Sequence, residues 1–224
     1  GDLNLYSGDA LTLTVNAAAN GYVTDSDRNV DVGICQGRLS ASTGVAVPTS
    51  DVSSSVSVFY VPYVGNKVAL FDGTGAWAVF RFANISVAVP STTNTPFDVF
   101  AYNNSGVVAL ETATWTNASS RATGITLQDG VFCKVGSLTR RYLGTCCTIG
   151  TSGNTEDTLA RRYVWNYYNR VLRPMRNATE TADSWTYTTA AFRQANANAA
   201  NQLDFVIGLS EDAVSSVVLA SVRS

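Results

Sequence analysis

Residues 97–115 read FDVFAYNNSGVVALETATW, and this stretch decides the fold class. A run rich in Phe, Val and Tyr leads into Asn103-Asn104-Ser105-Gly106, and a second apolar run follows from Val107 to Trp115. Aromatic and β-branched residues fit a pleated surface, while Asn and Gly accept the positive φ angles of tight turns. The stretch therefore predicts a β-hairpin with strands at 97–102 and 107–115.

Short strands of the same kind recur on both sides of this hairpin, separated by Gly, Asn, Asp and Pro. The predicted strands are 11–15, 56–61, 67–71, 77–82, 85–89, 125–127, 131–135, 141–149, 203–207 and 214–222. Strands at a spacing of about 8–12 residues with turn signals between them are typical of sandwiches and barrels. We therefore predict an all-β fold, an antiparallel β-sandwich or jelly-roll-like domain.

One segment is compatible with a helix. Glu156 and Asp157 would favour a helix N-terminus, whereas the aromatic and β-branched residues from Tyr163 to Val171 fit a strand better. The sequence therefore predicts at most one short helix near 155–161, or a turn there, with a strand after it.

The length of the chain and the residues at its ends indicate how it is organised into domains. The 224 residues are enough to bury a core without help from metal or disulfides. We expect an N-terminal strand or arm over residues 1–20 and a main β domain over 21–224, with 117–124 as a candidate internal boundary. The chain starts at Gly1 and its only methionine is Met175, so we expect a processed chain or a fragment of a longer protein. With no signal peptide and no run of about 18 apolar residues, no membrane insertion is expected.

The charge balance points to assembly and away from nucleic acid. Charged residues make up 14% of the chain and the net charge is −2, whereas globular domains carry about 25% charged residues. No Lys/Arg block forms a footprint for nucleic acid. Lys67 and Lys134 are the only lysines among 15 basic residues. Because arginine is enriched and lysine depleted at protein interfaces, we expect a homo-oligomer.

Residue types exclude several kinds of catalysis. With no histidine, Ser-His and Cys-His nucleophiles and imidazole metal ligands are excluded. Cys35, Cys133, Cys146 and Cys147 form no CxxC pair, so they are interpreted as small buried hydrophobic residues. In a strand, Cys146 and Cys147 would point to opposite faces, and a disulfide is not implied. We predict no metal and no cofactor.

Paired carboxylates would be the remaining route to catalysis, as in sugar hydrolysis. The candidates are Glu111, Glu156, Asp157, Glu180, Asp183, Glu211 and Asp212. Most stand beside Thr, Ser or Asn, in turn-like contexts where carboxylates cap backbone amides. We therefore predict no catalytic residues and no enzymatic activity.

The most distinctive segment is RRYVWNYYNR, residues 161–170, which arginines extend to residue 176. Trp, Tyr and Arg dominate interface hot spots, and the rings also stack on sugars. Three interpretations stay open: packing within the domain's own sheet, a subunit interface, or a site for a glycan or other ligand. The candidate interface residues are Arg162, Tyr163, Trp165, Tyr167, Tyr168, Arg170, Arg173 and Trp185.

A series of segments carries a family resemblance. They are PYVGN (62–66), Asp72-Gly73, FDVF (97–100), GVFCK (130–134), RRYLGT (140–145), GNTED (153–157), VWNYYNRV (164–171), SWTY (184–187) and FRQAN (192–196). Their order resembles a module of tail-fibre-like and other virion structural proteins of tailed bacteriophages, over roughly residues 55–210. WNYYNR is the most specific part, while the turns are generic. The chain departs from the module at Cys146-Cys147, where a bulky or basic pair is expected.

The resemblance implies a protein of the phage particle, commonly a homotrimer, that contacts copies of itself and other virion proteins. The leading hypothesis is a fibre or appendage component that contributes to host attachment, with a host-surface glycan as a candidate partner. The alternative is a capsid decoration or cement protein that stabilises the head. A remote alternative is a glycan-degrading tailspike-like enzyme, which would depend on Glu156 or Asp157.

Overall fold

The computed structural model describes residues 31–177, 179–182, 184–186, 191 and 193–210. The chain divides into two units, residues 1–31 and 32–224, and the described sheets belong to the second. The strands predicted at 11–15 and 214–222, and the arm predicted over 1–20, lie outside the described residues. The boundaries expected near residue 20 and at 117–124 stay predictions.

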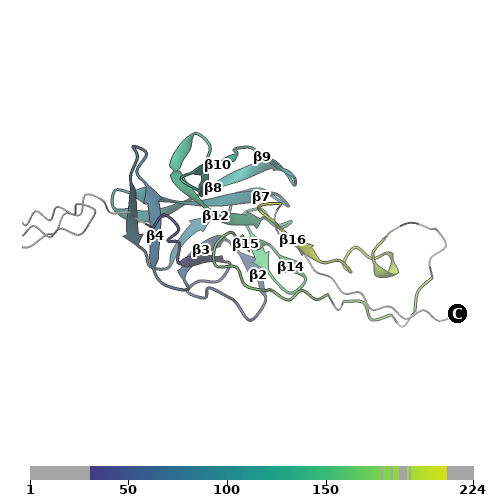
Figure 1. Cartoon of the computed structure of the whole chain (residues 1–224). Helices are drawn as coiled ribbons and strands as arrows, with labels where there is room; N and C mark the ends of the chain where they lie inside the picture. The colour runs from purple at the N-terminus through teal and green to yellow at the C-terminus, as the bar shows by residue number, and fades with distance from the viewer. Residues whose placement is uncertain (1–30, 178, 183, 187–190, 192, 211–224) are drawn as a thin grey trace, which may run out of the picture. The chain divides into compact units, whose positions relative to one another are not determined.

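The second unit is built from short strands, so the all-β prediction is confirmed (Figure 1). The first half holds β1 (Gly37–Ser40), β2 (Val52–Ser55), β3 (Ser57–Pro62), β4 (Lys67–Phe71), β5 (Trp77–Arg81), β6 (Ile85–Ala88), β7 (Pro96–Asn104) and β8 (Val107–Asn117). The second half holds β9 (Ser120–Arg121), β10 (Ile125–Gln128), β11 (Val131–Lys134), β12 (Ser137–Cys147), β13 (Thr155–Asp157), β14 (Arg161–Arg162), β15 (Val164–Asn166), the 3₁₀ turn η1 (Ala195–Ala197) and β16 (Asp204–Phe205). No helix among the described residues is long and apolar enough to cross a bilayer.

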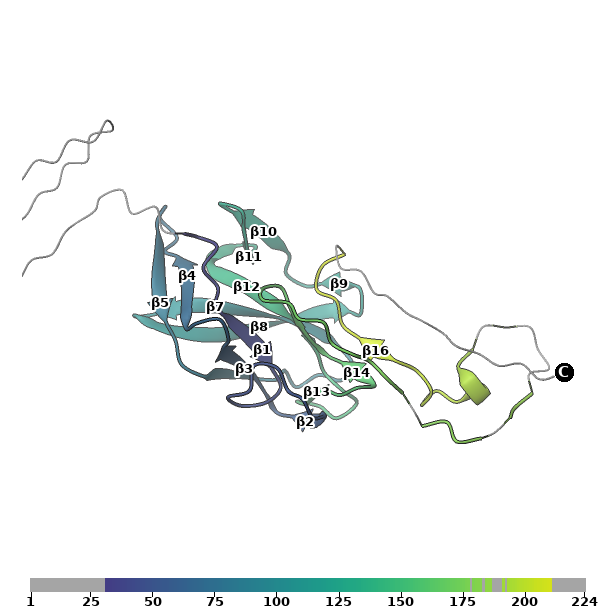
Figure 2. The same cartoon turned by 60° about the horizontal axis from the view of Figure 1, so that its bottom comes forward.

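These strands form four sheets (Figure 2). The largest has seven strands, in the order β10-β11-β12-β7-β8-β9, with β15 also paired to β12. A three-stranded sheet has the order β1-β3-β6, a four-stranded sheet the order β16-β14-β13-β2, and β4 pairs with β5. The described pairings are antiparallel apart from the short parallel pair β14·β16. The predicted antiparallel arrangement is therefore confirmed.

The core lies between the three-stranded sheet and one face of the large sheet. Leu39, Val58 and Tyr60 enter it from the small sheet, and Phe97 and Val99 enter it from β7. On the opposite face of β7, Phe100 packs against Tyr142 of β12 and is also fully buried. Strand β7 is thus covered on both faces, which accounts for the apolar run, interrupted by Asp98, at the start of the quoted stretch.

The hairpin predicted at 97–115 forms as β7 and β8, with Asn104 opposite Val107. Its turn places Ser105 at φ 52° and Gly106 at φ 94°. Asp129 and Gly130 connect β10 to β11 with the same pair of positive φ angles, 49° and 79°. Two consecutive positive φ angles match the right-handed twist of the flanking strands, so both turn signals were correctly interpreted.

The helix considered near 155–161 is not formed. Residues 155–157 are strand β13, and the chain turns back into β14 through paired hydrogen bonds between Thr158 and Arg161 (2.8 and 3.2 Å). The carboxylates expected at a helix N-terminus instead accept hydrogen bonds from arginines, Glu156 from Arg161 and Asp157 from Arg162. The turn is therefore the correct alternative. The strand expected from 163 onward is shorter than predicted, Val164–Asn166.

Candidate functional site

Two of the predicted interface arginines are bound inside the domain. Arg162 donates from Nη1 to Asp157 Oδ1 (2.9 Å) and from Nη2 to the carbonyl of Pro174 (2.8 Å). Arg173 donates to the other oxygen of Asp157 (2.8 Å), which is 5% exposed. One buried carboxylate thus joins β13, β14 and the segment after residue 171.

The aromatic part of the predicted cluster packs against the large sheet. The rings of Trp165 and Tyr167 lie 6.4 and 6.0 Å from the ring of Tyr142, measured between centroids. The guanidinium of Arg170 lies over both of them, at 4.9 Å from Trp165 and 5.4 Å from Tyr167. Tyr168 packs against the hydrophobic core. Trp165 and Tyr167 are partly exposed and Arg170 is exposed, so the cluster serves packing while presenting one stacked aromatic and arginine face.

The remaining two predicted residues lie apart from that face. Trp185 is 41% exposed, in the stretch between β15 and β16. Tyr163 lines a separate cleft, where burial raises the pKa of its hydroxyl to about 12. The eight predicted residues therefore occupy four places, so the sequence pattern overestimated how many of them act together.

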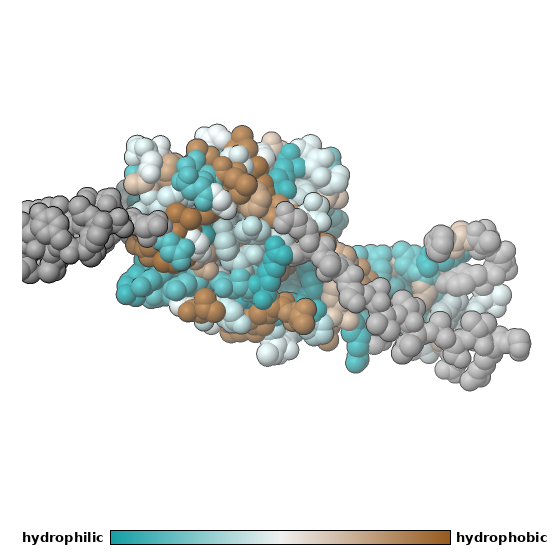
Figure 3. Space-filling view, viewed as in Figure 1, coloured by the Kyte–Doolittle hydropathy of each residue, from teal (hydrophilic) through white to brown (hydrophobic). Residues whose placement is uncertain are grey.

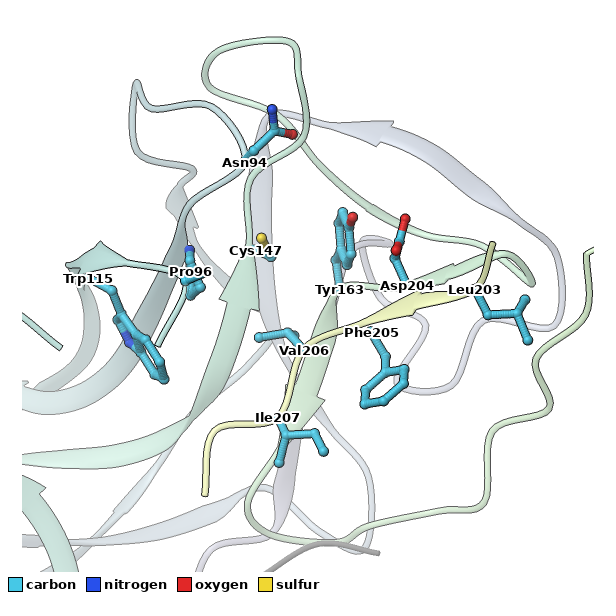
Figure 4. Close-up of a pocket in the computed structure, with 11 residues that line it drawn as sticks. Asn94, Pro96, Trp115, Cys147, Tyr163, Leu203, Asp204, Phe205, Val206 and Ile207 are labelled. Atoms are coloured by element: carbon cyan, nitrogen blue, oxygen red, sulfur yellow. The ribbon is translucent and has the colours of Figure 1, made fainter. Parts of the chain in front are cut away.

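The cleft has a volume of about 330 Å³ and is formed by segments distant in the sequence (Figure 4). Figure 4 shows Pro96 and Trp115 on one side, and Tyr163 with the segment from Leu203 to Ile207 on the other. Its lining residues are Asn94, Pro96, Trp115, Ala118, Cys147, Tyr163, Leu203, Asp204, Phe205, Val206 and Ile207. One wall is thus a single continuous stretch of the C-terminal part of the chain.

The chemistry of this cleft suits binding. Its carboxylate, Asp204, lies 3.4 Å from Arg161 Nε, and Arg161 also binds Glu156. Its thiol, Cys147, has a pKa raised by burial to about 11. A thiol with that pKa stays protonated at neutral pH and is a poor nucleophile. What the cleft offers is aromatic and apolar area with a few polar groups, the usual composition of a ligand or peptide site.

A buried polar cluster beside this cleft was not predicted from the sequence. Asp98, 0% exposed, forms an ion pair with Arg121 (Oδ2 to Nε, 2.7 Å). Thr145 donates its hydroxyl proton to Asp98 Oδ1 (2.7 Å), and the Tyr142 hydroxyl lies 2.6 Å from Thr145 Oγ1. Arg121 further donates to the carbonyl of Gly208. A carboxylate inside an apolar strand was the one signal in the sequence that could have revealed this cluster.

Four of the carboxylates considered for hydrolysis are described and have structural partners, Glu180 accepting a hydrogen bond from Asn201 (2.6 Å). The other three candidates, Asp183, Glu211 and Asp212, lie outside the described residues. Glu156 binds Arg161 at 3.0 Å, and Asp157 binds two arginines. Glu111 bridges Lys134 and Arg140 at 2.8 and 2.9 Å. Among the described residues, no three thiol or carboxylate groups converge as metal ligands would.

Comparison of the chain with protein-family models, curated proteins and solved structures gave no match. Three features of the second unit bear on its function. They are the internally bound arginines, the stacked face at Trp165, Tyr167 and Arg170, and the cleft walled by residues 203–207.

Proposed function

We propose that this chain is a non-enzymatic structural protein of a tailed-bacteriophage particle, a component of a fibre or appendage that contributes to host attachment. The observation that carries the proposal is how the arginines are used. Arg121, Arg162 and Arg173 bind buried carboxylates, while Arg141 donates to the backbone carbonyls of Val32 and Ala69. Arginines used in this way stiffen the sheets, as a scaffold under load requires, because each planar fork fixes several groups at once.

The surface of the second unit supports an adhesive role. Figure 3 shows apolar residues in several separate groups among polar ones on the visible face. Val56, Val107 and Leu127 are each more than half exposed, at 66%, 66% and 58%. A surface with apolar side chains this exposed and few charged residues contacts neighbouring proteins at a low desolvation cost.

Capsid decoration is the alternative function, since it also requires a stiff scaffold with an adhesive surface. The position of the protein on the particle distinguishes a decoration protein from a fibre or appendage component. A tailspike-like hydrolase is disfavoured because Glu156 and Asp157, its candidate acids, are bound to Arg161, Arg162 and Arg173. The family resemblance and the scaffold-like use of charge together support the fibre or appendage role.

Immunogold labelling of purified particles tests the proposal directly. Antibodies raised against the chain are expected to label the tail or its appendages, and labelling confined to the head would favour the decoration role. Absence of the chain from purified particles, checked by mass spectrometry of the same preparation, would contradict both. A matched binding assay then measures retention of the purified protein on host cells against retention on capsid shells.

A further inference from the structure

The large sheet has a second face on the side opposite the core, which we term the outer face. Along β7, Phe97 and Val99 point into the core, so Phe100 points to the other side of the sheet. The pairing register places Glu111 of β8 and Tyr142 of β12 directly opposite Phe100, on that same side. Side chains from several neighbouring strands therefore share the outer face.

A row of aromatic rings lies on the outer face. The ring centroid of Tyr167 is 5.3 Å from that of Phe132 and 6.2 Å from that of Trp165. Tyr142 joins this row to the sheet, 6.0 Å from Tyr167. The three rings of the row are partly exposed. They therefore offer adjacent apolar platforms at the surface, on which the C–H faces of sugar rings can pack.

A network of charged side chains adjoins the row of rings, because Lys134 lies two residues after Phe132 on β11. Glu111 accepts hydrogen bonds from Lys134 Nζ (2.8 Å) and Arg140 Nε (2.9 Å). The side chains of Glu111, Lys134 and Arg140 are 25%, 25% and 27% exposed. Arg140 also stacks on the ring of Tyr102, at 4.0 Å from its centroid. The network thus presents donors and an acceptor side by side, which suits sugar hydroxyls because each hydroxyl both donates and accepts.

The charges gathered on the outer face are mostly positive. Four cations stand against two carboxylates, so the face carries a net charge of +2 in a chain whose net charge is −2. The cations are Lys134, Arg140, Arg121 and Arg170, and the carboxylates are Glu111 and Asp98. Arg170 is the exposed member of this set. Charge complementarity therefore favours an acidic partner for this face.

Two other kinds of partner fit the outer face less well. A nucleic acid would bring a phosphate at every nucleotide close to the partly exposed carboxylate of Glu111, and like charges repel. The centre of a protein interface is depleted of charged residues, whereas here Lys134 and Arg140 lie beside the rings. Rings, hydroxyl-binding groups and excess positive charge occur together in a site for an acidic sugar chain.

We propose that the outer face of the large sheet binds an acidic polysaccharide. Sugar rings pack on Phe132, Tyr167 and Trp165, and hydroxyl groups bind the network around Glu111. Arg170, whose N–H donors lie in the plane of the guanidinium while its face covers the two rings, pairs with a sugar carboxylate. The inference rests on the proposed function in one respect, since it names the class of host-surface molecule that an attachment protein would bind.

Calorimetric titration of the full-length gene product with polygalacturonate and with alginate tests this site. Both polymers consist of uronic acids, and neutral dextran is the comparison. The affinity for at least one acidic polymer is expected to exceed that for dextran by about tenfold or more, and to fall as NaCl is raised and screens the charges.

A pair of single variants locates the binding on the outer face. Arg170→Gln is expected to weaken binding of the acidic polymer by about tenfold, because it removes the exposed cation beside the rings. Arg81→Gln is the matched control, an exposed arginine of β5 that donates to Asn66, and should leave the affinity within about twofold. Urea denaturation confirms that each variant is folded. Should Arg170→Gln fail to fold, Arg140→Gln gives the same reading.

The outcomes separate this site from the proposed function. Binding no tighter than that of dextran, or equal effects of Arg170→Gln and Arg81→Gln, overturns the site. Tighter binding of single-stranded oligodeoxythymidylate than of either acidic polymer also overturns it, in favour of nucleic acid. Retention on host cells without binding of the acidic polymers overturns the site and leaves the attachment role standing. Binding of an acidic polymer by a chain that is absent from purified particles supports the site and contradicts the proposed function.

Discussion

At the scale of single residues, glycines mark where backbones approach too closely for any side chain. Gly144 of β12 would place a Cβ 2.2 Å from the Trp165 carbonyl oxygen, and Gly208 meets Tyr142 and Thr145 at comparable distances. These two glycines explain how β15 and segment 203–208 come to lie against β12. Neither role is visible in the sequence, because a close approach depends on a partner distant along the chain.

Replacement of Gly208 by alanine is expected to lower the free energy of unfolding by about 1–3 kcal/mol, because the added methyl group overlaps the Tyr142 hydroxyl. Chemical denaturation of the variant checks this expectation. Gly150→Ala is the matched control, since a Cβ there meets nothing within 4 Å, and its effect should stay within about 0.5 kcal/mol. Equal stabilities for the two variants would show that residue 208 isn't packed as described.

The thiols make stability depend on alkaline pH. Burial raises the pKa of Cys133 and of Cys147 from 9.0 to about 11. Between these values the unfolded chain has released protons that the folded chain still holds, so stability is full below pH 9.0 and falls as the pH rises toward 11. Urea midpoints measured across this range are expected to decrease, and the decrease should be smaller in Cys147→Ser. A midpoint that rises would contradict the burial of these thiols.

At the scale of elements, Arg141 holds β12 to the hairpin β4–β5 and to the start of the second unit. Its guanidinium donates to the carbonyls of Val32 (2.7 Å) and Ala69 (2.8 Å) and lies 4.6 Å from the ring centroid of Tyr168. Residue 141 is only 1% exposed. A side chain with one terminal nitrogen cannot reproduce this fork, so lysine is no conservative replacement here.

Arg141→Lys is therefore expected to destabilise the protein by about 1–3 kcal/mol, because buried carbonyl oxygens lose their donors. Hydrogen exchange should locate the loss at residues 67–71, the strand that holds the Ala69 carbonyl. Arg81→Lys serves as the control, since Arg81 donates to Asn66 at the exposed surface and its replacement should stay within about 0.5 kcal/mol. Faster exchange spread evenly over all sheets would contradict a local role for Arg141.

Asp157 holds the segment after residue 171 to the four-stranded sheet, because it forms ion pairs with Arg162 of β14 and with Arg173. Asp157→Asn is expected to cost about 3–5 kcal/mol, because it leaves two partly buried arginines without their charge partner. Limited trypsin digestion should then cut faster after Arg176, because Pro174 blocks cleavage after Arg173 whereas Asn177 follows Arg176. An unchanged rate of cleavage there would show that the ion pairs of Asp157 do not hold the segment after residue 171 in place.

At the scale of the whole molecule, the composition predicts association and the structure supplies surfaces for it. Val107 on β8 and Leu127 on β10 are exposed on the large sheet, where Lys134 and Arg140 are paired with Glu111. Light scattering on the full-length gene product is expected to give the mass of three subunits. A clean monomer at micromolar concentration would contradict this expectation.

What the sequence determined by itself is the local part of the structure. The hairpin at 97–115, the strand at 67–71 and the turn at Asp129-Gly130 were predicted because alternation and turn residues act between neighbours in the chain. The opposite orientations of Cys146, in the core, and Cys147, in the cleft, follow from the period of a strand in the same way.

Only the tertiary structure decided which distant segments meet. The sequence pattern predicted that the arginines and aromatic residues of 161–176 form one interface. In the folded chain, Arg162 pairs with Asp157, Tyr163 lines the cleft, and the ring of Trp165 packs against that of Tyr142. The buried Asp98–Arg121 pair and the docking of Gly208 likewise join residues that are far apart in the chain. Side-chain pairing of this kind depends on which strands distant in the chain come together, and alternation and turn residues do not determine that order.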